Sequence, residues 1–229
     1  MRTRKPKSGE FIGADSSEHC PRCALNLAIC VCDAVPRVVT RTEIFIIRHA
    51  AELRLASNTG RFAALCLPNA RILEYAGRSV LDSAALLERA DTYLLYHSGG
   101  PLTELPLARP PQRLIVLDGT FRQARRMYKR IAELRRLPEL ALPPPAVAPA
   151  RLRQPPTREG MSTLEAIAHA LSLLEGPELG KPLHDLQSEL VRRFDALGGR
   201  RRVPPLPAAQ APEDPGPEVG GSSASFSSR

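Results

Sequence analysis

Short runs of β-branched and other apolar residues alternate along the chain with longer amphipathic segments, and this alternation limits the fold more than any other feature. The apolar runs at 43–47, 70–73, 92–96 and 113–117 predict four strands. Helical patterns cover 60–67, 79–90 and 121–136 between these runs, and 162–175 and 183–197 after them. Strands that alternate with helices through short links form a mostly parallel sheet flanked by helices. The sequence therefore predicts an α/β fold whose ligands bind beyond the carboxyl ends of the strands.

Composition divides the chain into four segments. Residues 1–18 are basic without periodicity and 201–229 are rich in proline, glycine and serine, so both are expected to be disordered because they bury too little apolar surface to offset chain entropy. Between them we expect a small cysteine knuckle at 19–36 and one larger domain at 37–200. Within that domain the prolines of 142–160 predict an extended loop.

The charge of the chain favours a polyanionic partner. Its 229 residues contain 32 Lys and Arg against 24 Asp and Glu, a net charge of +8, and such an excess supports phosphate contacts. The sequence has no run of 18 apolar residues, and its basic start is not followed by an apolar segment. Neither a membrane span nor a secretory signal is therefore predicted, and we expect a cytoplasmic protein without a membrane partner.

Four of the five cysteines lie close together in the sequence. Cys20, Cys23, Cys30 and Cys32 form a C-x2-C-x6-C-x-C array. Four thiolates complete the tetrahedral shell of Zn²⁺ and leave no open position for a substrate, so this pattern predicts a structural zinc site. Four reduced, buried cysteines and an iron–sulfur cluster are the alternatives.

Four motifs in the same order resemble the DTW-domain family of tRNA-uridine aminocarboxypropyltransferases. They are the cysteine array, His49 with Ser57-Asn-Thr-Gly-Arg61, Leu117-Asp-Gly-Thr-Phe-Arg-Gln-Ala124, and Arg151-Leu-Arg-Gln-Pro-Pro with Ser162-Thr-Leu-Glu165. The resemblance covers roughly residues 19–190 and implies that 37–200 is a catalytic domain of SPOUT-like fold with a C-terminal knot. It further implies transfer of the 3-amino-3-carboxypropyl group of S-adenosylmethionine to N3 of a tRNA uridine.

The resemblance implies a catalytic group at Asp118, Thr120 and Phe121. A carboxylate at the end of a strand is a reasonable base for the uridine N3 proton, and Asp118 has that position. Phe121 stands where the family has its name-giving tryptophan, so an apolar face is kept but the indole N–H is lost. The alternative for Asp118-Gly-Thr is a simple helix N-cap.

Donor binding is expected at His49 and at four short segments. Arg61 is a candidate for the donor carboxylate or an RNA phosphate, with a surface salt bridge as the alternative. The segment 97–99 is a candidate for adenine or ribose contacts, with a plain turn as the alternative. The segment 162–165 is a candidate for binding an anion at a helix N-terminus, and it is also a capping box. The expected residues are His49, Asn58, Thr59, Gly60, Arg61, His97, Ser98, Gly99, Asp118, Gly119, Ser162, Thr163 and Glu165.

RNA binding is expected on one helix face and on the proline loop. Arg122, Arg125, Arg126 and Lys129 share a face that begins beside Asp118, and Arg151 and Arg153 lie in the loop. We expect them to contact the tRNA backbone. Two other functions remain open: RNA methyl transfer on the same fold, and a non-catalytic, zinc-containing RNA-binding protein.

Overall fold

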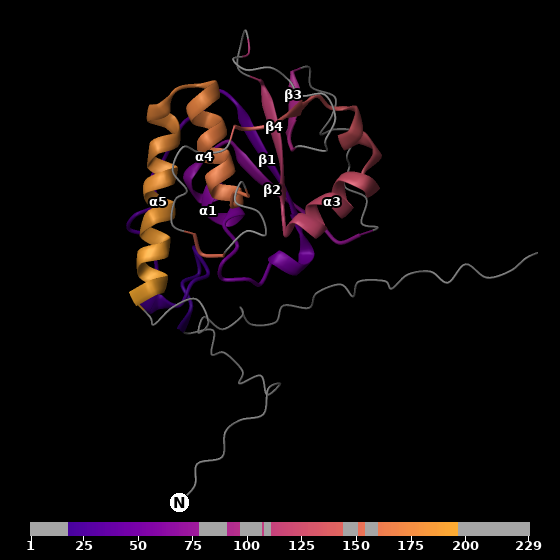
Figure 1. Ribbon diagram of the computed structural model, residues 1–229. Coiled ribbons are helices and arrows are strands. Elements are labelled where there is room, and N and C mark those ends of the chain that lie inside the picture. The colour runs from indigo at the N-terminus through magenta and orange to yellow at the C-terminus, as the bar shows by residue number, and fades with distance from the viewer. Residues whose placement is uncertain are drawn as a thin grey trace, which may run out of the picture.

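A five-stranded parallel sheet forms the centre of the computed structural model, which describes residues 18–77, 91–96, 107, 111–143, 151–153 and 160–196 (Figure 1). The four predicted strands are confirmed as β1 (Glu43–His49), β2 (Ala70–Tyr75), β3 (Thr92–Leu95) and β4 (Arg113–Asp118). A two-residue strand, β5 (Glu139–Leu140), was not predicted. The order is β2-β1-β4-β3-β5, and every pair is parallel.

The two central strands are covered on both faces. All six residues of β4 and the five inner residues of β1 are buried, which explains why these strands read as almost continuous apolar runs. Their register pairs Arg48 with Asp118, so β1 and β4 end at the same edge of the sheet. The edge that carries Asp118 is therefore the edge at which the fold predicts ligands.

Helices flank the sheet on both faces, as predicted (Figure 1). One face is packed by α1 (Gly60–Cys66), α4 (Thr163–Leu174) and α5 (Pro177–Ala196), and the other by α3 (Phe121–Arg130). Alternate strand residues point to opposite faces: Ile44 and Ile46 of β1 join the first core, and Phe45 and Ile47 the second.

Two predicted helix boundaries were wrong. The helix expected over 121–136 ends at Arg130, because Ile131 is extended and buried, and a separate 3-10 helix, η4 (Ala132–Arg136), follows. The helix expected from 183 begins at Pro177 and contains Pro182. Proline suits the first helical position, and Gly180 permits a close crossing, since a Cβ there would lie 2.2 Å from the carbonyl oxygen of Ala168 in α4.

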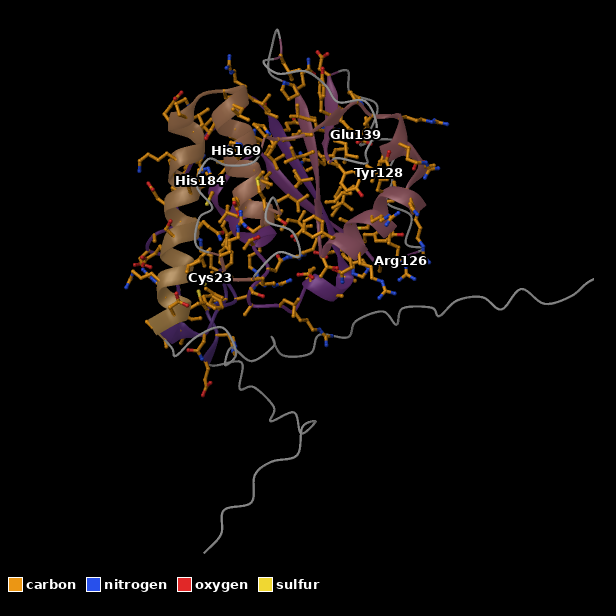
Figure 2. The ribbon with its side chains drawn as sticks, in the orientation of Figure 1. Cys23, Arg126, Tyr128, Glu139, His169 and His184 are labelled. Atoms are coloured by element: carbon orange, nitrogen blue, oxygen red, sulfur yellow. The ribbon has the colours of Figure 1, made fainter. Side chains whose placement is uncertain are left out.

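The cysteine knuckle is part of the main hydrophobic core. Its short 3-10 helix, η2 (Leu27–Ile29), presents Ile29 to the interior, and Leu25 and Val31 are fully buried beside it. Figure 2 shows Cys23 near the C-terminal end of α5, and Arg193 of α5 donates to the carbonyl oxygen of Cys30. The knuckle is thus packed against the α/β body.

Several predictions fall on other parts of the chain. The predicted helix 79–90, residues 97–99 and the predicted disordered segments lie outside the described residues, apart from Glu18. Among the helices that are described, none is both long and apolar enough to cross a membrane.

Candidate functional site

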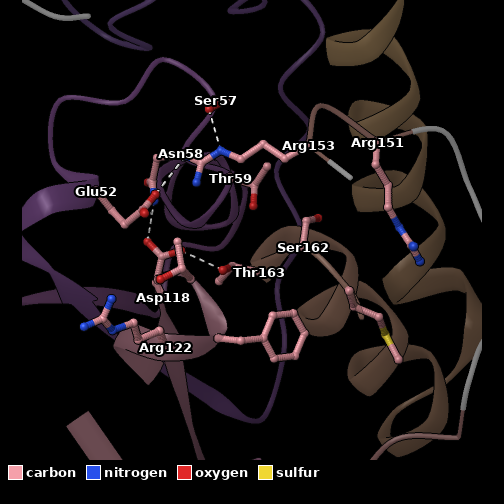
Figure 3. A pocket seen from close by; sticks show the side chains of 14 residues that line it. Glu52, Ser57, Asn58, Thr59, Asp118, Arg122, Arg151, Arg153, Ser162 and Thr163 are labelled. Atoms are coloured by element: carbon pink, nitrogen blue, oxygen red, sulfur yellow. Dashed lines mark hydrogen bonds and ion pairs between the residues drawn. The ribbon is translucent and has the colours of Figure 1, made fainter. Parts of the chain in front are cut away.

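A cavity of about 480 Å³ opens at the carboxyl end of β4, a volume typical of small-molecule sites. Figure 3 shows its side chains converging from the loop before α1, the end of β4 and the start of α4. The lining residues are Glu52, Ser57, Asn58, Thr59, Asp118, Gly119, Thr120, Phe121, Arg122, Arg151, Arg153, Met161, Ser162 and Thr163.

Asp118 lies at the floor of this cavity and is held by two neutral donors. Nδ2 of Asn58 donates to Oδ2 over 2.6 Å, and the hydroxyl of Thr163 donates to Oδ1 over 2.6 Å (Figure 3). The residue is only 3% exposed. Burial raises the pKa of Asp118 above its ordinary value, although the two hydrogen bonds oppose that shift. A carboxylate in this state combines fixed geometry with increased basicity.

Gly60 makes room for the Asp118 carboxylate. A Cβ at position 60 would lie 2.5 Å from Oδ2 of Asp118, well inside contact distance. The side chain of Asn58 is fixed in turn, because its Oδ1 accepts from the main-chain N–H of Arg61. Thr59 accepts from the N–H of Leu164 and so links this loop to α4. The predicted Asn-Thr-Gly segment is therefore at the site, with Gly60 behind the carboxylate rather than on the cavity wall.

The Ser162 capping box is confirmed. The Ser162 hydroxyl accepts from the N–H of Glu165, and Glu165 Oε2 accepts from the N–H of Ser162. Glu165 is 1% exposed and receives two further hydrogen bonds from Arg151, of 2.9 and 2.6 Å.

This ion pair corrects the roles expected for both partners. Glu165 was expected to bind the donor, but its carboxylate is enclosed by protein donors and does not line the cavity. Arg151 was expected to bind RNA, but it is buried and both of its donating nitrogens point to Glu165. The pair instead joins the segment at 151–153 to the first turn of α4.

Arg61 and His49 also lie elsewhere than expected. Arg61 is 8% exposed and donates to the carbonyl oxygens of Cys23 and Leu55, so it is neither on the surface nor on the cavity wall. Burial lowers its pKa to about 10. His49 accepts from the N–H of Ala51 and packs against Tyr75 with ring centroids 6.2 Å apart. Neither residue is part of the cavity wall.

Glu52, Ser57 and Met161 line the cavity although they were not predicted as site residues. Nη2 of Arg153 donates to Glu52 over 2.8 Å, and Nε donates to the Ser57 hydroxyl over 2.7 Å. Arg153 was expected to contact RNA, and the structure places it across the mouth of the cavity. Ser57 belonged to the recognised motif, but Glu52 has no local sequence signal.

The basic face of α3 begins at the cavity mouth. A capping box of Thr120 and Gln123 starts the helix, so the N-cap expected here comes from Thr120. Arg122, Arg125, Arg126 and Lys129 are all exposed, as an RNA-binding face requires. Arg122 alone among them also lines the cavity.

A second cavity of about 370 Å³ adjoins the first. Because its lining residues are mainly apolar and those of the first are mainly polar or charged, we call them the apolar and the polar cavity. Gly119, Phe121, Met161 and Thr163 line both. The other walls come mainly from the ends of β3, β4 and β5, including Leu95, Leu117 and Leu140. Tyr96, the residue that directly precedes 97–99 in the sequence, also lines it.

The four clustered cysteines have the geometry of a tetrahedral metal site. Their Sγ atoms all lie within 4.8 Å of one another, with Cys20 and Cys32 3.5 Å apart and Cys23 and Cys30 3.7 Å apart. Zinc with four Zn–S bonds of about 2.3 Å needs sulfur–sulfur distances of about 3.8 Å. Hydrogen bonds, the largest from the main-chain N–H of Cys23, lower the pKa of Cys20 to about 6, whereas burial raises the pKa of Cys23 and of Cys32. The distances between the sulfur atoms are therefore the evidence for a metal site. The cluster therefore fits a metal ion.

Comparison with known proteins identifies the family. The DTW domain matches residues 17–197, most of the chain. The chain belongs to the DTW-domain family. The segment predicted to be the name-giving motif of the family includes Phe121, which lines both cavities and is 52% exposed. An apolar ring is thus available to a ligand from either side, without an indole N–H donor.

Curated relatives of the chain carry the name tRNA-uridine aminocarboxypropyltransferase 2 and are therefore transferases. The Drosophila melanogaster protein is 31% identical over 182 residues, which cover 73% of this chain and 72% of the relative. The Macaca fascicularis protein is 29% identical over 189 residues, which cover 78% of this chain and 61% of the relative. The Mus musculus protein is 30% identical over 195 residues, which cover 80% of this chain and 63% of the relative. The matches thus span less than two thirds of the two mammalian proteins. No solved structure is significantly similar to the chain.

Proposed function

We propose that this DTW-domain protein is a tRNA-uridine aminocarboxypropyltransferase that uses S-adenosylmethionine and forms 3-(3-amino-3-carboxypropyl)uridine. The observation that carries the proposal is Asp118, a buried carboxylate with a raised pKa and two fixed donors at the floor of a cavity of ligand size. The names of the relatives support the substrate class. A SPOUT-like knot and a cytoplasmic location belong to the same proposal.

The two adjoining cavities suit the two halves of S-adenosylmethionine. The apolar cavity offers Leu95, Leu117 and Leu140 to a nucleoside, and a donor role for residues 97–99 remains part of the proposal. The polar cavity contains the carboxylates of Glu52 and Asp118, which favour a cationic sulfonium nearby. The residues present therefore fit this donor.

Asp118 acts in this proposal as the base for uridine N3. It takes the N3 proton as N3 bonds to the γ-carbon of the donor, while the S–Cγ bond breaks with its electron pair moving to sulfur and 5′-methylthioadenosine leaves. Asn58 and Thr163 hold both carboxylate oxygens, so the base needs no reorganisation before it accepts the proton. Phe121 offers an apolar face on which a planar base can stack.

The tRNA backbone is proposed to lie along α3. Arg122, Arg125, Arg126 and Lys129 are exposed on that helix, and they lead away from the cavity mouth. Backbone contacts of this kind position the RNA without reading its sequence. Zinc at the four cysteines is proposed as a structural ion, since a closed thiolate shell leaves no position for a substrate.

Labelled donor distinguishes the three functions considered for this chain. The purified protein is incubated with unmodified tRNA and S-adenosylmethionine labelled either in the carboxyl group or in the methyl group. Carboxyl label in RNA, with the modified uridine found by nucleoside mass spectrometry, is the expected result. Methyl label in RNA would assign methyl transfer instead. Binding of tRNA without binding of S-adenosylmethionine by calorimetry would assign a non-catalytic RNA-binding role.

A further inference from the structure

We propose that the polar cavity contains a subsite for the zwitterionic α-amino acid end of the donor, in which Glu52 binds the ammonium group and Arg122 and Arg153 bind the carboxylate. The inference rests on the proposed function, and it assigns roles toward the donor to residues that the family motifs leave unassigned or assign to RNA.

Glu52 is a carboxylate enclosed in the cavity wall. Its side chain is 3% exposed, and Oε2 accepts a hydrogen bond from Arg153. Oε1 accepts no hydrogen bond from the described residues and is not among their fully buried atoms, so it is accessible to a ligand. A buried carboxylate is stable only when its oxygens are matched by donors or cations. An ammonium group in the cavity supplies the missing donors and a positive charge.

Glu52 and Asp118 have different environments although they share one cavity. Asp118 accepts one neutral hydrogen bond on each oxygen, and the lone pairs that remain are available for the uridine N3 proton. Their mutual repulsion is one of the factors that raise the pKa of Asp118. When the ammonium group of the donor binds to Glu52, Asp118 stays available to accept the proton of uridine N3.

Two guanidinium groups with unused donors face the same cavity. Arg153 donates Nε to Ser57 and Nη2 to Glu52, and its Nη1 has no acceptor among the described residues. Arg122 makes no hydrogen bond or ion pair within the described part of the chain. Arg151, the third arginine on the wall, is already paired with Glu165. Arg122 and Arg153 are thus the cations available to a ligand carboxylate.

This arrangement bears on which carbon of the sulfonium is transferred. A donor anchored by both charged groups of its amino acid end holds that chain inside the cavity beside Asp118, whereas a methyl group offers nothing for Glu52 or the two arginines to bind. Orientation of the reacting bond is a large part of the rate of such a displacement. By holding that chain beside Asp118, the subsite brings its γ-carbon to the side of the cavity where the proposed base lies.

Two stable nucleosides test the subsite by calorimetry. S-adenosylhomocysteine carries the zwitterionic arm, and 5′-methylthioadenosine lacks it. The wild-type chain is expected to bind S-adenosylhomocysteine at least tenfold more tightly. Glu52→Gln and Arg122→Gln are each expected to remove most of that difference while changing the affinity for 5′-methylthioadenosine less than twofold. Arg122 is exposed, so its variant keeps the test valid even if the buried Glu52 variant does not fold.

Matched controls and the opposing outcomes complete the test. Glu178→Gln and Arg37→Gln make the same charge changes at exposed positions away from the cavity and are expected to bind both nucleosides as the wild type does. Equal wild-type affinity for the two nucleosides, or equal weakening of both by the Glu52 and Arg122 variants, would overturn the subsite and leave the donor assignment intact. Absence of binding for both nucleosides to the wild type would overturn the proposed function as well.

Discussion

The guanidinium of Arg61 in α1 donates to the main-chain carbonyl of Cys23 in the knuckle across 3.3 Å. A second nitrogen of the same side chain donates to the carbonyl of Leu55, in the loop that leads to Asn58. The N–H of Arg61 supports Asn58, which donates to Asp118. One buried residue therefore connects the cysteine cluster with the loop that holds the candidate base.

Replacement of Arg61 by alanine is expected to destabilise the fold without weakening donor binding. Two carbonyls, one buried and one partly buried, lose their donor at roughly 1–3 kcal/mol each, so the free energy of unfolding should fall by about 2–6 kcal/mol. Urea unfolding measures the loss, and calorimetry on the folded fraction measures S-adenosylhomocysteine affinity. Stability near that of the wild type together with lost binding would restore Arg61 as a direct ligand of the donor.

Asp118→Asn is expected to retain donor affinity within about twofold and to lose turnover by at least 100-fold, the lower range for general base catalysis. The asparagine oxygen still accepts from Asn58, and its amide group donates to the Thr163 hydroxyl, so both contacts survive. Single-turnover assays with tRNA and calorimetry with S-adenosylhomocysteine separate the two effects. Turnover at the wild-type rate would exclude Asp118 as the base.

The pH dependence of stability gives a separate test of Asp118. Burial raises its pKa in the folded chain, so the folded state holds the proton more tightly than the unfolded state, whose pKa is about 3.9. Ionisation therefore costs stability as pH rises from that value to the raised folded pKa. Over this window Asp118→Asn should become progressively more stable relative to the wild type, as measured by urea unfolding at several pH values. A constant difference across the window would contradict the raised pKa.

Loss of one cysteine ligand is expected to remove the metal and to lower the stability of the fold. Cys20→Ser and Cys32→Ser should lower bound zinc from about one ion per chain to near none, measured by elemental analysis. The Tm should fall by on the order of 10 °C, which corresponds to about 3–5 kcal/mol for a domain of this size. Cys66→Ala is the control, since Cys66 is buried away from the cluster and should keep its zinc. Full zinc content in Cys20→Ser would remove that residue from the ligand set.

Arg125 and Lys129, exposed cations of α3 that do not line the cavity, are expected to contribute to tRNA affinity and not to donor affinity. In the double variant Arg125→Gln and Lys129→Gln, the salt dependence of tRNA binding should weaken by a slope of about 2, one for each lost phosphate contact. Arg37→Gln with Arg192→Gln makes the same charge change elsewhere on the exposed surface. Filter binding at several salt concentrations compares the two, and identical slopes would place the RNA on another face.

Local patterns in the sequence were sufficient for the strands, the capping boxes and most of the cavity wall. β1 and β4 are continuous apolar runs because both of their faces are buried, and Ser162 with Glu165 is a capping box that four residues define. The end of α3 was not predicted because Ile131 continues the apolar stripe of the helix in the sequence. In the structure Ile131 is extended and packs in the hydrophobic core on the α3 side of the sheet. Such tertiary effects have no local signal.

The roles of charged residues were harder to predict for the same reason. Glu52 and Arg153 are 101 residues apart, and Arg61 and Cys23 are 38 apart. An arginine in a motif looks the same whether it faces a ligand or a buried carbonyl, and only its partner decides between them. The sequence therefore located the segments of the site but not which of their cations are free to bind.

The two side chains that donate to Asp118 come from distant parts of the chain: Asn58 lies 60 residues before it and Thr163 lies 45 residues after it. Contacts of such sequence separation form only once the intervening loops have closed. An incompletely folded chain consequently carries an ordinary, hydrated aspartate at this position, with ordinary acidity. The pKa of Asp118 therefore depends on whether the end of β4, the loop before α1 and the start of α4 have all reached their native positions.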